Sequence, residues 1–187
     1  MFTFDEQSHT YYLDGVKIPS VTEIISPLYD FSGVNPDRLE KAAQYGKAVH
    51  KLVELYLKGR LDYNSVSPEL KTIDLSYFDK FRMYMTEYKA YCSRFAGTID
   101  LYLPTNAIID LKTRKYHPAT DDLQLYAYEM LAGGKLDKFI IELLPNKEPK
   151  MIKVVNRQAK NMFLYMLNHY ENEKDFKLKL EGWKNAK

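Results

Sequence analysis

The 187-residue chain contains a single cysteine, Cys92. One thiol cannot form an internal disulfide, a four-thiolate zinc site or a four-cysteine iron–sulfur cluster, so a metal would need oxygen and nitrogen ligands. The sequence lacks a run of about 18 apolar residues, which a membrane span requires. Its first ten residues lack the basic and then apolar profile of a secretory signal. We therefore expect a cytoplasmic protein without a membrane partner.

A strong charge bias is also missing. The formal net charge is +2, so overall charge does not indicate a nucleic-acid partner. The composition, 45% hydrophobic and 28% charged, is typical of globular proteins, and the length predicts one domain over residues 1–187. Aromatic residues are abundant, with 16 tyrosines and 9 phenylalanines. Such rings stack on bases, but they also build ordinary cores, so their number decides nothing.

The N-terminal half carries turn and helix signals. In residues 1–30, Asp14-Gly15 predicts a hairpin turn, and Ser20 with Glu23 forms the capping box of a short helix that ends before Pro27. Asn35 precedes a first-turn proline, which predicts a helix over 36–58 ended by Gly59. Apolar spacing predicts a second helix from residue 68 to about 85.

The second half predicts mainly strands. Expected strands cover 87–92, 95–103, 107–113, 139–144 and 151–155, and a helix capped by Thr120 ends at Gly133. A last helix begins near Arg157, within a C-terminal segment 157–187. The order predicts an α/β (α+β) fold in which helices flank a central mixed sheet, with its core in residues 36–155.

The candidate site lies on the hairpin of residues 97–113. If residues 104–106 form the loop, Asp100 lies opposite Asp110, with Cβ atoms about 4.5–5.5 Å apart. Like charges so placed destabilise a sheet unless a cation neutralises them, and Mg²⁺ prefers carboxylate ligands. The alternative is an ordinary ion pair of Lys112 with both acids on an exposed sheet face. The apolar run 107–109 favours a buried central strand instead.

Lys112 lies two residues after Asp110 and therefore on the same face of the strand. An ammonium at this place could align an attacking water or stabilise charge on a reacting phosphate. Two carboxylates, a divalent metal and a lysine are suited to phosphodiester hydrolysis.

The residues around each histidine in the sequence indicate whether it could be a metal ligand. His50 lies one helical turn from both Gly46 and Glu54, on a stripe of small residues. Taken alone it fits a buried core histidine better than a ligand, and beside two aspartates the metal role is favoured. His9, His117 and His169 lack such neighbours, and we interpret them as surface or structural residues.

Gln124 and Tyr128 are four residues apart, so they share one helix face. Leucines and alanine already provide the apolar stripe of that helix. The pair fits a surface glutamine and a rim tyrosine, or two polar groups directed at a site.

These segments together resemble the PD-(D/E)XK nuclease superfamily in its RecB-like exonuclease branch, of the phage type without an iron–sulfur cluster. The resemblance lies in GTID, IIDLKT, LQLYAY and the upstream YGKAVHKLVE, and it covers most of residues 9–130. It departs in two places, since no proline precedes Asp100 and the second acid, Asp110, is not glutamate. The resemblance implies a restriction-endonuclease-like core.

The resemblance also implies a role for each matching residue. Asp100 and Asp110 match metal-binding acids, and Lys112 matches the catalytic lysine. Metal contacts are further implied for His50 and the Leu111 carbonyl, and substrate binding for Gln124, Tyr128 and Glu54.

The expected function is therefore a Mg²⁺- or Mn²⁺-dependent deoxyribonuclease of a bacterium or a phage-infected host. An exonuclease in phage or mobile-element DNA processing, recombination or repair is favoured, acting on single-stranded DNA or duplex ends. A helicase, recombinase or single-strand-binding protein could be its partner. The alternatives are a non-catalytic nucleic-acid-binding subunit and a structure- or site-specific endonuclease.

Overall fold

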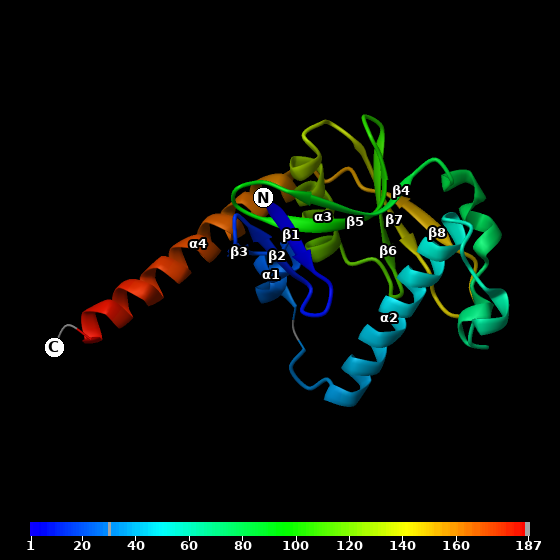
Figure 1. The fold of residues 1–187 in the computed structure, drawn as a ribbon, viewed down its shortest axis with the longest axis horizontal. Helices are drawn as coiled ribbons and strands as arrows, with labels where there is room; N and C mark the ends of the chain where they lie inside the picture. The colour runs from blue at the N-terminus through cyan, green and yellow to red at the C-terminus, as the bar shows by residue number, and fades with distance from the viewer. Residues whose placement is uncertain (30, 186–187) are drawn as a thin grey trace.

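A computed structural model describes residues 1–29 and 31–185, with side chains up to residue 173. Asp30 and residues 186–187, at the ends of the predicted N- and C-terminal segments, lie outside the described residues. The centre is a five-stranded sheet in the order β4-β5-β6-β7-β8 (Figure 1). Its strands are β4 (Met85–Tyr91), β5 (Ala96–Leu103), β6 (Ala107–Lys112), β7 (Asp137–Glu142) and β8 (Lys150–Lys153). β6 and β7 are parallel and the other neighbours antiparallel, which confirms the mixed α/β sheet.

A second, three-stranded sheet is formed by β1 (Phe2–Asp5), β2 (Thr10–Leu13) and β3 (Val16–Ile18). The predicted turn at Asp14-Gly15 is confirmed, with φ of 51° and 79°. β1 was not predicted. This sheet is fastened to β5, because the Tyr11 hydroxyl lies 2.7 Å from Thr98 Oγ1 and Ala96 N donates to the Pro19 carbonyl.

The first two helices follow their predicted signals. α1 (Val21–Ile25) carries both hydrogen bonds of the capping box between Ser20 and Glu23, and a 3-10 turn η1 (Ser26–Leu28) follows it. α2 (Pro36–Leu57) begins after the Asn35 cap, whose side chain accepts from the Asp37 amide. The chain leaves α2 through Gly59 at a φ of 64°.

The predicted helix over 68–85 is wrong. That region contains the 3-10 segments η3 (Leu70–Thr72) and η4 (Leu75–Phe81), after an earlier η2 (Tyr63–Ser65). Ile73 is extended, and the Asp74 side chain accepts from the Ser76 amide, so the backbone turns where a helix would have to continue. Phe78 and Phe81 are nevertheless buried, which explains why the apolar spacing suggested a helix.

α3 (Pro118–Ala132) is the crossover that connects parallel β6 and β7. Its cap is His117, so the predicted cap Thr120 is wrong: the first-turn proline moves the start upstream, and Thr120 lies buried inside the first turn. The predicted end at Gly133 is confirmed. α4 (Gln158–Asn185) packs on α3 and then extends away from the body of the protein (Figure 1).

Apolar clusters cover both faces of the central sheet. One joins the sheet to α1, α3 and α4, and the other joins it to α2 and η4. Ile99 belongs to the first cluster and Leu101 to the second, although a strand with a period of two would place both on one face. The regular alternation of β5 is therefore broken between them, at Asp100. No helix among the described residues has the length and apolar character needed to cross a membrane.

Candidate active site

Three acids lie in one row across three strands. The pairs on either side of Glu87 place it opposite Asp100 in the β4–β5 ladder. Leu101 and Ile109 are the last pair of the β5–β6 ladder, and Asp100 and Asp110 are the next residue on each strand beyond that pair. Both line one cavity, so the structure brings together the two acids that the sequence predicted to lie opposite each other. Glu87 has a φ of 52°, and ladder pairing is interrupted at this row. Such a row of like charges is unfavourable in a sheet without a cation.

Asp100 is held by contacts to both of its oxygens. Oδ2 accepts from the Leu111 amide at 2.6 Å, and Oδ1 lies 3.2 Å from His50 Nδ1. The other ring nitrogen of His50 lies 3.0 Å from the Leu111 carbonyl. Burial lowers the pKa of His50, but the Asp100 carboxylate outweighs this and raises it to about 9. His50 is thus an imidazolium that donates to two oxygens and neutralises Asp100.

Glu87 completes a cluster with metal-ligating potential. Ligand atoms of His50, Glu87 and Asp100 all lie within 4.8 Å of one another. Burial, and next the charge of Asp100, raise the pKa of Glu87 to about 7. Carboxylates of this kind suit Mg²⁺ or Mn²⁺, and an imidazole can join them for Mn²⁺. Sequence reasoning missed Glu87, although pairing residues 87–92 back onto 96–100 would have placed it opposite Asp100.

Asp110 and Lys112 form the other end of the row. Asp110 is 2% exposed, and its Oδ2 lies 2.7 Å from Lys112 Nζ without the angles of a hydrogen bond. Burial, with a further contribution from Asp100, raises the pKa of Asp110 to about 6 despite the lysine. Burial lowers the pKa of Lys112, but Asp110 and Asp121 raise it more, so the group is an ammonium.

α3 contributes Gln124 and Tyr128 to this end. Lys112 Nζ donates to Gln124 Oε1 at 2.8 Å, and Gln124 Nε2 donates to the Tyr128 hydroxyl at 2.7 Å. Both residues are buried, 6% and 4% exposed, so they are not a surface glutamine and a rim tyrosine. The ring of Tyr128 packs on Gly97, where a Cβ would lie 2.6 Å from the Tyr128 Cε1 atom. These contacts connect α3 both to Lys112 and to β5.

Asp121 lies close to the ammonium of Lys112, and Arg114 pairs with Asp121. The sequence analysis predicted neither residue as part of the site. Asp121 is fully buried, with Oδ1 3.9 Å from Lys112 Nζ. Arg114 donates to both of its oxygens, at 2.9 and 2.5 Å. Asp121 lies three residues before Gln124, so a shared helix face was the available signal.

Glu54 is the predicted site residue that lies apart from the row. Its carboxylate pairs with Lys51 at 2.8 Å and Lys58 at 2.6 Å, both on α2. The structure does not bring Glu54 into contact with the three acids, and its substrate role stays a prediction.

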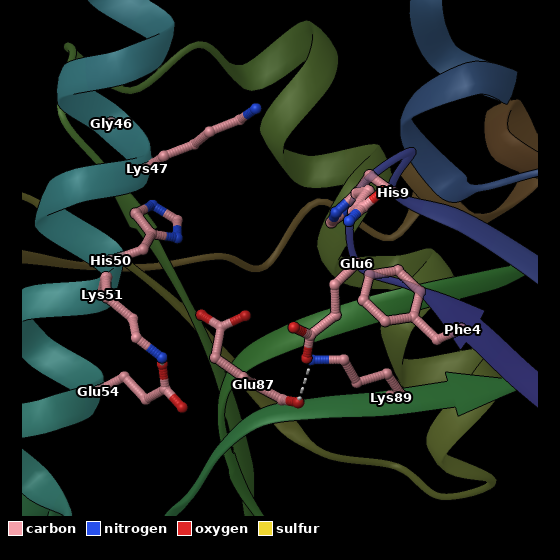
Figure 2. Close-up of a pocket in the computed structure, with 11 residues that line it drawn as sticks. Phe4, Glu6, His9, Gly46, Lys47, His50, Lys51, Glu54, Glu87 and Lys89 are labelled. Carbon is pink, nitrogen blue, oxygen red and sulfur yellow. Dashed lines mark hydrogen bonds and ion pairs between the residues drawn. The ribbon is translucent and has the colours of Figure 1, made fainter.

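Two adjoining cavities give access to these groups. The inner cavity, about 210 Å³, is lined by His50, the acid row, Lys112, Gln124 and Tyr128. An outer one of about 480 Å³ lies between α2, β4 and the N-terminal sheet, and shares His9, His50 and Glu87 with the first (Figure 2). His9 was interpreted as a surface or structural residue. It is exposed, but it lines both cavities.

Comparison with known proteins gives likenesses to solved structures only. No protein-family model and no curated protein sequence matches this chain. The crystal structure of a candidate exonuclease from Eubacterium rectale resembles it, with 19% sequence identity and a TM-score of 0.49. The match covers 68% of this chain and 65% of that protein, so the chain spans less than two thirds of its length. The likeness concerns the course of the backbone, and the functional argument rests on the side chains described above.

Proposed function

We propose that this chain is a metal-dependent deoxyribonuclease that hydrolyses phosphodiester bonds at the acid row. One observation carries the proposal: Glu87, Asp100 and Asp110, from β4, β5 and β6, line one cavity together with the partly buried ammonium of Lys112, which lies 2.7 Å from Asp110. An inactive nucleic-acid-binding subunit would gain nothing from buried acids that repel one another. This favours the enzyme over the non-catalytic alternative.

The residues present fit a divalent cation. Glu87 and Asp100 supply carboxylate oxygens within 4.8 Å of each other. Asp110 lines the same cavity, and its Oδ2 has no hydrogen bond among the described residues. The Leu111 carbonyl is an adjacent further ligand, and His50 would become one only on losing the proton that it holds without a cation. A bound Mg²⁺ or Mn²⁺ would neutralise the row and polarise a phosphate oxygen.

Lys112 has a separate part in this proposal. Because it is an ammonium, it donates hydrogen bonds and stabilises negative charge that develops on the phosphate. Asp110 and Gln124 fix its position, and Tyr128 fixes Gln124. Gln124 and Tyr128 are therefore positioning residues that could also touch the substrate strand.

The finer assignment is an exonuclease of the PD-(D/E)XK, RecB-like kind in phage or mobile-element DNA processing. The order and spacing of the four sequence motifs support it. A structure- or site-specific endonuclease shares the same chemistry, and the cleavage products distinguish the two.

The test is incubation of end-labelled single-stranded and duplex DNA with Mg²⁺, Mn²⁺ or EDTA. We expect metal-dependent cleavage, and a loss of at least about 10²–10³-fold in Asp110→Asn and Lys112→Ala. Lys115→Ala is the matched control, since it removes an exposed lysine three residues away. Thermal unfolding of each variant shows that it is folded.

Retained cleavage in folded Lys112→Ala would overturn the assignment of the site. DNA binding without cleavage under every metal would support the non-catalytic subunit instead. A ladder of products starting from one end would identify an exonuclease.

A further inference from the structure

We infer that the outer cavity is a binding groove for an unpaired nucleotide strand, so that the substrate is single-stranded DNA or the frayed end of a duplex. This rests on the proposed nuclease function. The groove lies between α2 on one side and β1 with the β1–β2 turn on the other (Figure 2).

The position of the acids argues for an unpaired strand. Asp100 and Asp110 are buried at the inner cavity of about 210 Å³, which opens beside the groove. A phosphate must enter this cavity to reach them. A recess of this size has room for a phosphate and its immediate neighbours but not for a complete duplex, so a strand that has left the duplex reaches the acids most readily.

The groove offers rings to the bases. The His9 ring meets Phe4 edge to face at 5.1 Å between ring centres, and Phe4 lies 4.8 Å from Tyr11. His9 has a φ of 50°, a left-handed backbone that fixes it at the turn. Partial burial of its ring, and next the charges of Lys89 and Lys47, lower the pKa of His9, which favours the neutral ring. Neutral aromatic faces are the platforms on which unpaired bases stack.

The opposite wall offers a charge to the backbone. Lys51 pairs with Glu54, and Lys89 donates to the Glu87 carbonyl. Lys47 has no ion pair among the described residues and extends from α2 toward the side of the groove where His9 lies (Figure 2). Glu6, Glu54 and Glu87 also line the groove, so its acids and lysines balance. The features that favour an unpaired strand are therefore the rings on one wall and, on the other, the cation of Lys47, which lacks an ion pair within the described part of the chain.

The test compares cleavage of a single-stranded oligonucleotide, a blunt duplex and duplexes with overhangs, all of one sequence. We expect the single strand to be cleaved at least about tenfold faster than the blunt duplex. Phe4→Ala/His9→Ala should raise KM for the single strand at least about fivefold, since stacking one base contributes that much or more, with kcat changed little. Lys47→Ala should raise KM and weaken its dependence on salt.

Two matched controls accompany these variants. Phe2→Ala removes the same ring from the same strand, where Phe2 stacks on Tyr91 instead of lining the groove. Lys41→Ala removes another exposed lysine of α2. Neither should change KM for the single strand.

If the blunt duplex is cleaved as fast as the single strand, or if KM is unchanged in Phe4→Ala/His9→Ala, the groove does not bind an unpaired strand and the inference is wrong. If the unmodified protein cleaves nothing, the nuclease proposal fails and the groove is tested by fluorescence anisotropy with a labelled single strand in EDTA. Weaker binding by the double variant than by Phe2→Ala would then support the groove alone, and equal binding would remove it as well.

Discussion

Neighbouring charges hold the carboxylates of this site in different states. Burial alone raises the pKa of every one of them. His50 and the Leu111 amide reverse the effect at Asp100, whose pKa is lowered, while Glu87 and Asp110 keep raised values. Glu87 and Asp110 therefore lie close to the pH at which they gain or lose a proton, whereas Asp100 stays charged beside them.

Asp121 is the support whose charge can be tested without touching the acid row. Burial raises its pKa, but Arg114, Lys112 and the His117 amide together lower it below its ordinary value of 3.8. A lowered carboxyl pKa stabilises the fold above the unfolded value, and the contribution is lost as pH falls through the folded value. Asp121→Asn should therefore cost about 1–3 kcal/mol at pH 7 and progressively less below about pH 4.

Urea unfolding of both proteins between pH 7 and pH 2.5 measures this difference. Glu148→Gln, an exposed acid of the β7–β8 turn, is the control and should cost nothing at either pH. A difference for Asp121→Asn that does not depend on pH would contradict the charge argument.

At the residue scale, the sequence predicted those site residues whose positions depend only on strand alternation and on one tight loop. Asp100, Asp110 and Lys112 follow from a three-residue loop and a period of two. Glu87 and Asp121 did not follow, because their place depends on how β4 joins β5 and on the rotation of α3 above the sheet. Those relations are set by tertiary packing, which a single strand or helix does not encode.

At the element scale, prediction succeeded where local signals begin or end a helix. The Asn35 cap, the Ser20 capping box and Gly133 each fix a boundary through one or two backbone hydrogen bonds or a positive φ. The segment 68–85 failed because its apolar residues are buried by α2 without the helix that their spacing suggested. Periodicity reports burial, and burial does not require a helix.

The end of α3 provides a stability prediction at this scale. Gly133 has a φ of 72°, a conformation in which a Cβ is strained, whereas Gly134 has no positive φ. Gly133→Ala should lower the free energy of unfolding by about 1 kcal/mol, and Gly134→Ala should be close to neutral. Urea unfolding measures both, and equal effects would show that backbone strain is not the cause. Activity per folded molecule should not change, because Gly133 lines neither of the two cavities.

At the scale of the whole molecule, the repulsion between neighbouring acids should make the free energy of unfolding smaller without a cation than with one bound. Mg²⁺ or Mn²⁺ should raise the unfolding midpoint, by the equivalent of about 2.7 kcal/mol at a concentration 100 times the dissociation constant. The increase should disappear in Asp100→Asn/Asp110→Asn and persist in Glu148→Gln. Thermal unfolding across a metal titration measures it. An increase that survives in the double variant would place the cation elsewhere.

The crossover between β6 and β7 also determines the order in which the parts of the site come together as the chain folds. The two aspartates lie on a local hairpin, which can pair as soon as it is synthesised, but Gln124 and Asp121 reach Lys112 only when α3 packs over the sheet. The parallel pairing that fixes α3 joins residues 107–112 to residues 137–142, and such non-local contacts form slowly. A nascent chain released from the ribosome only as far as β6 would therefore carry the acids without the partners that position its lysine. Under the proposed function, the chain would gain a positioned lysine only once β6 has paired with β7.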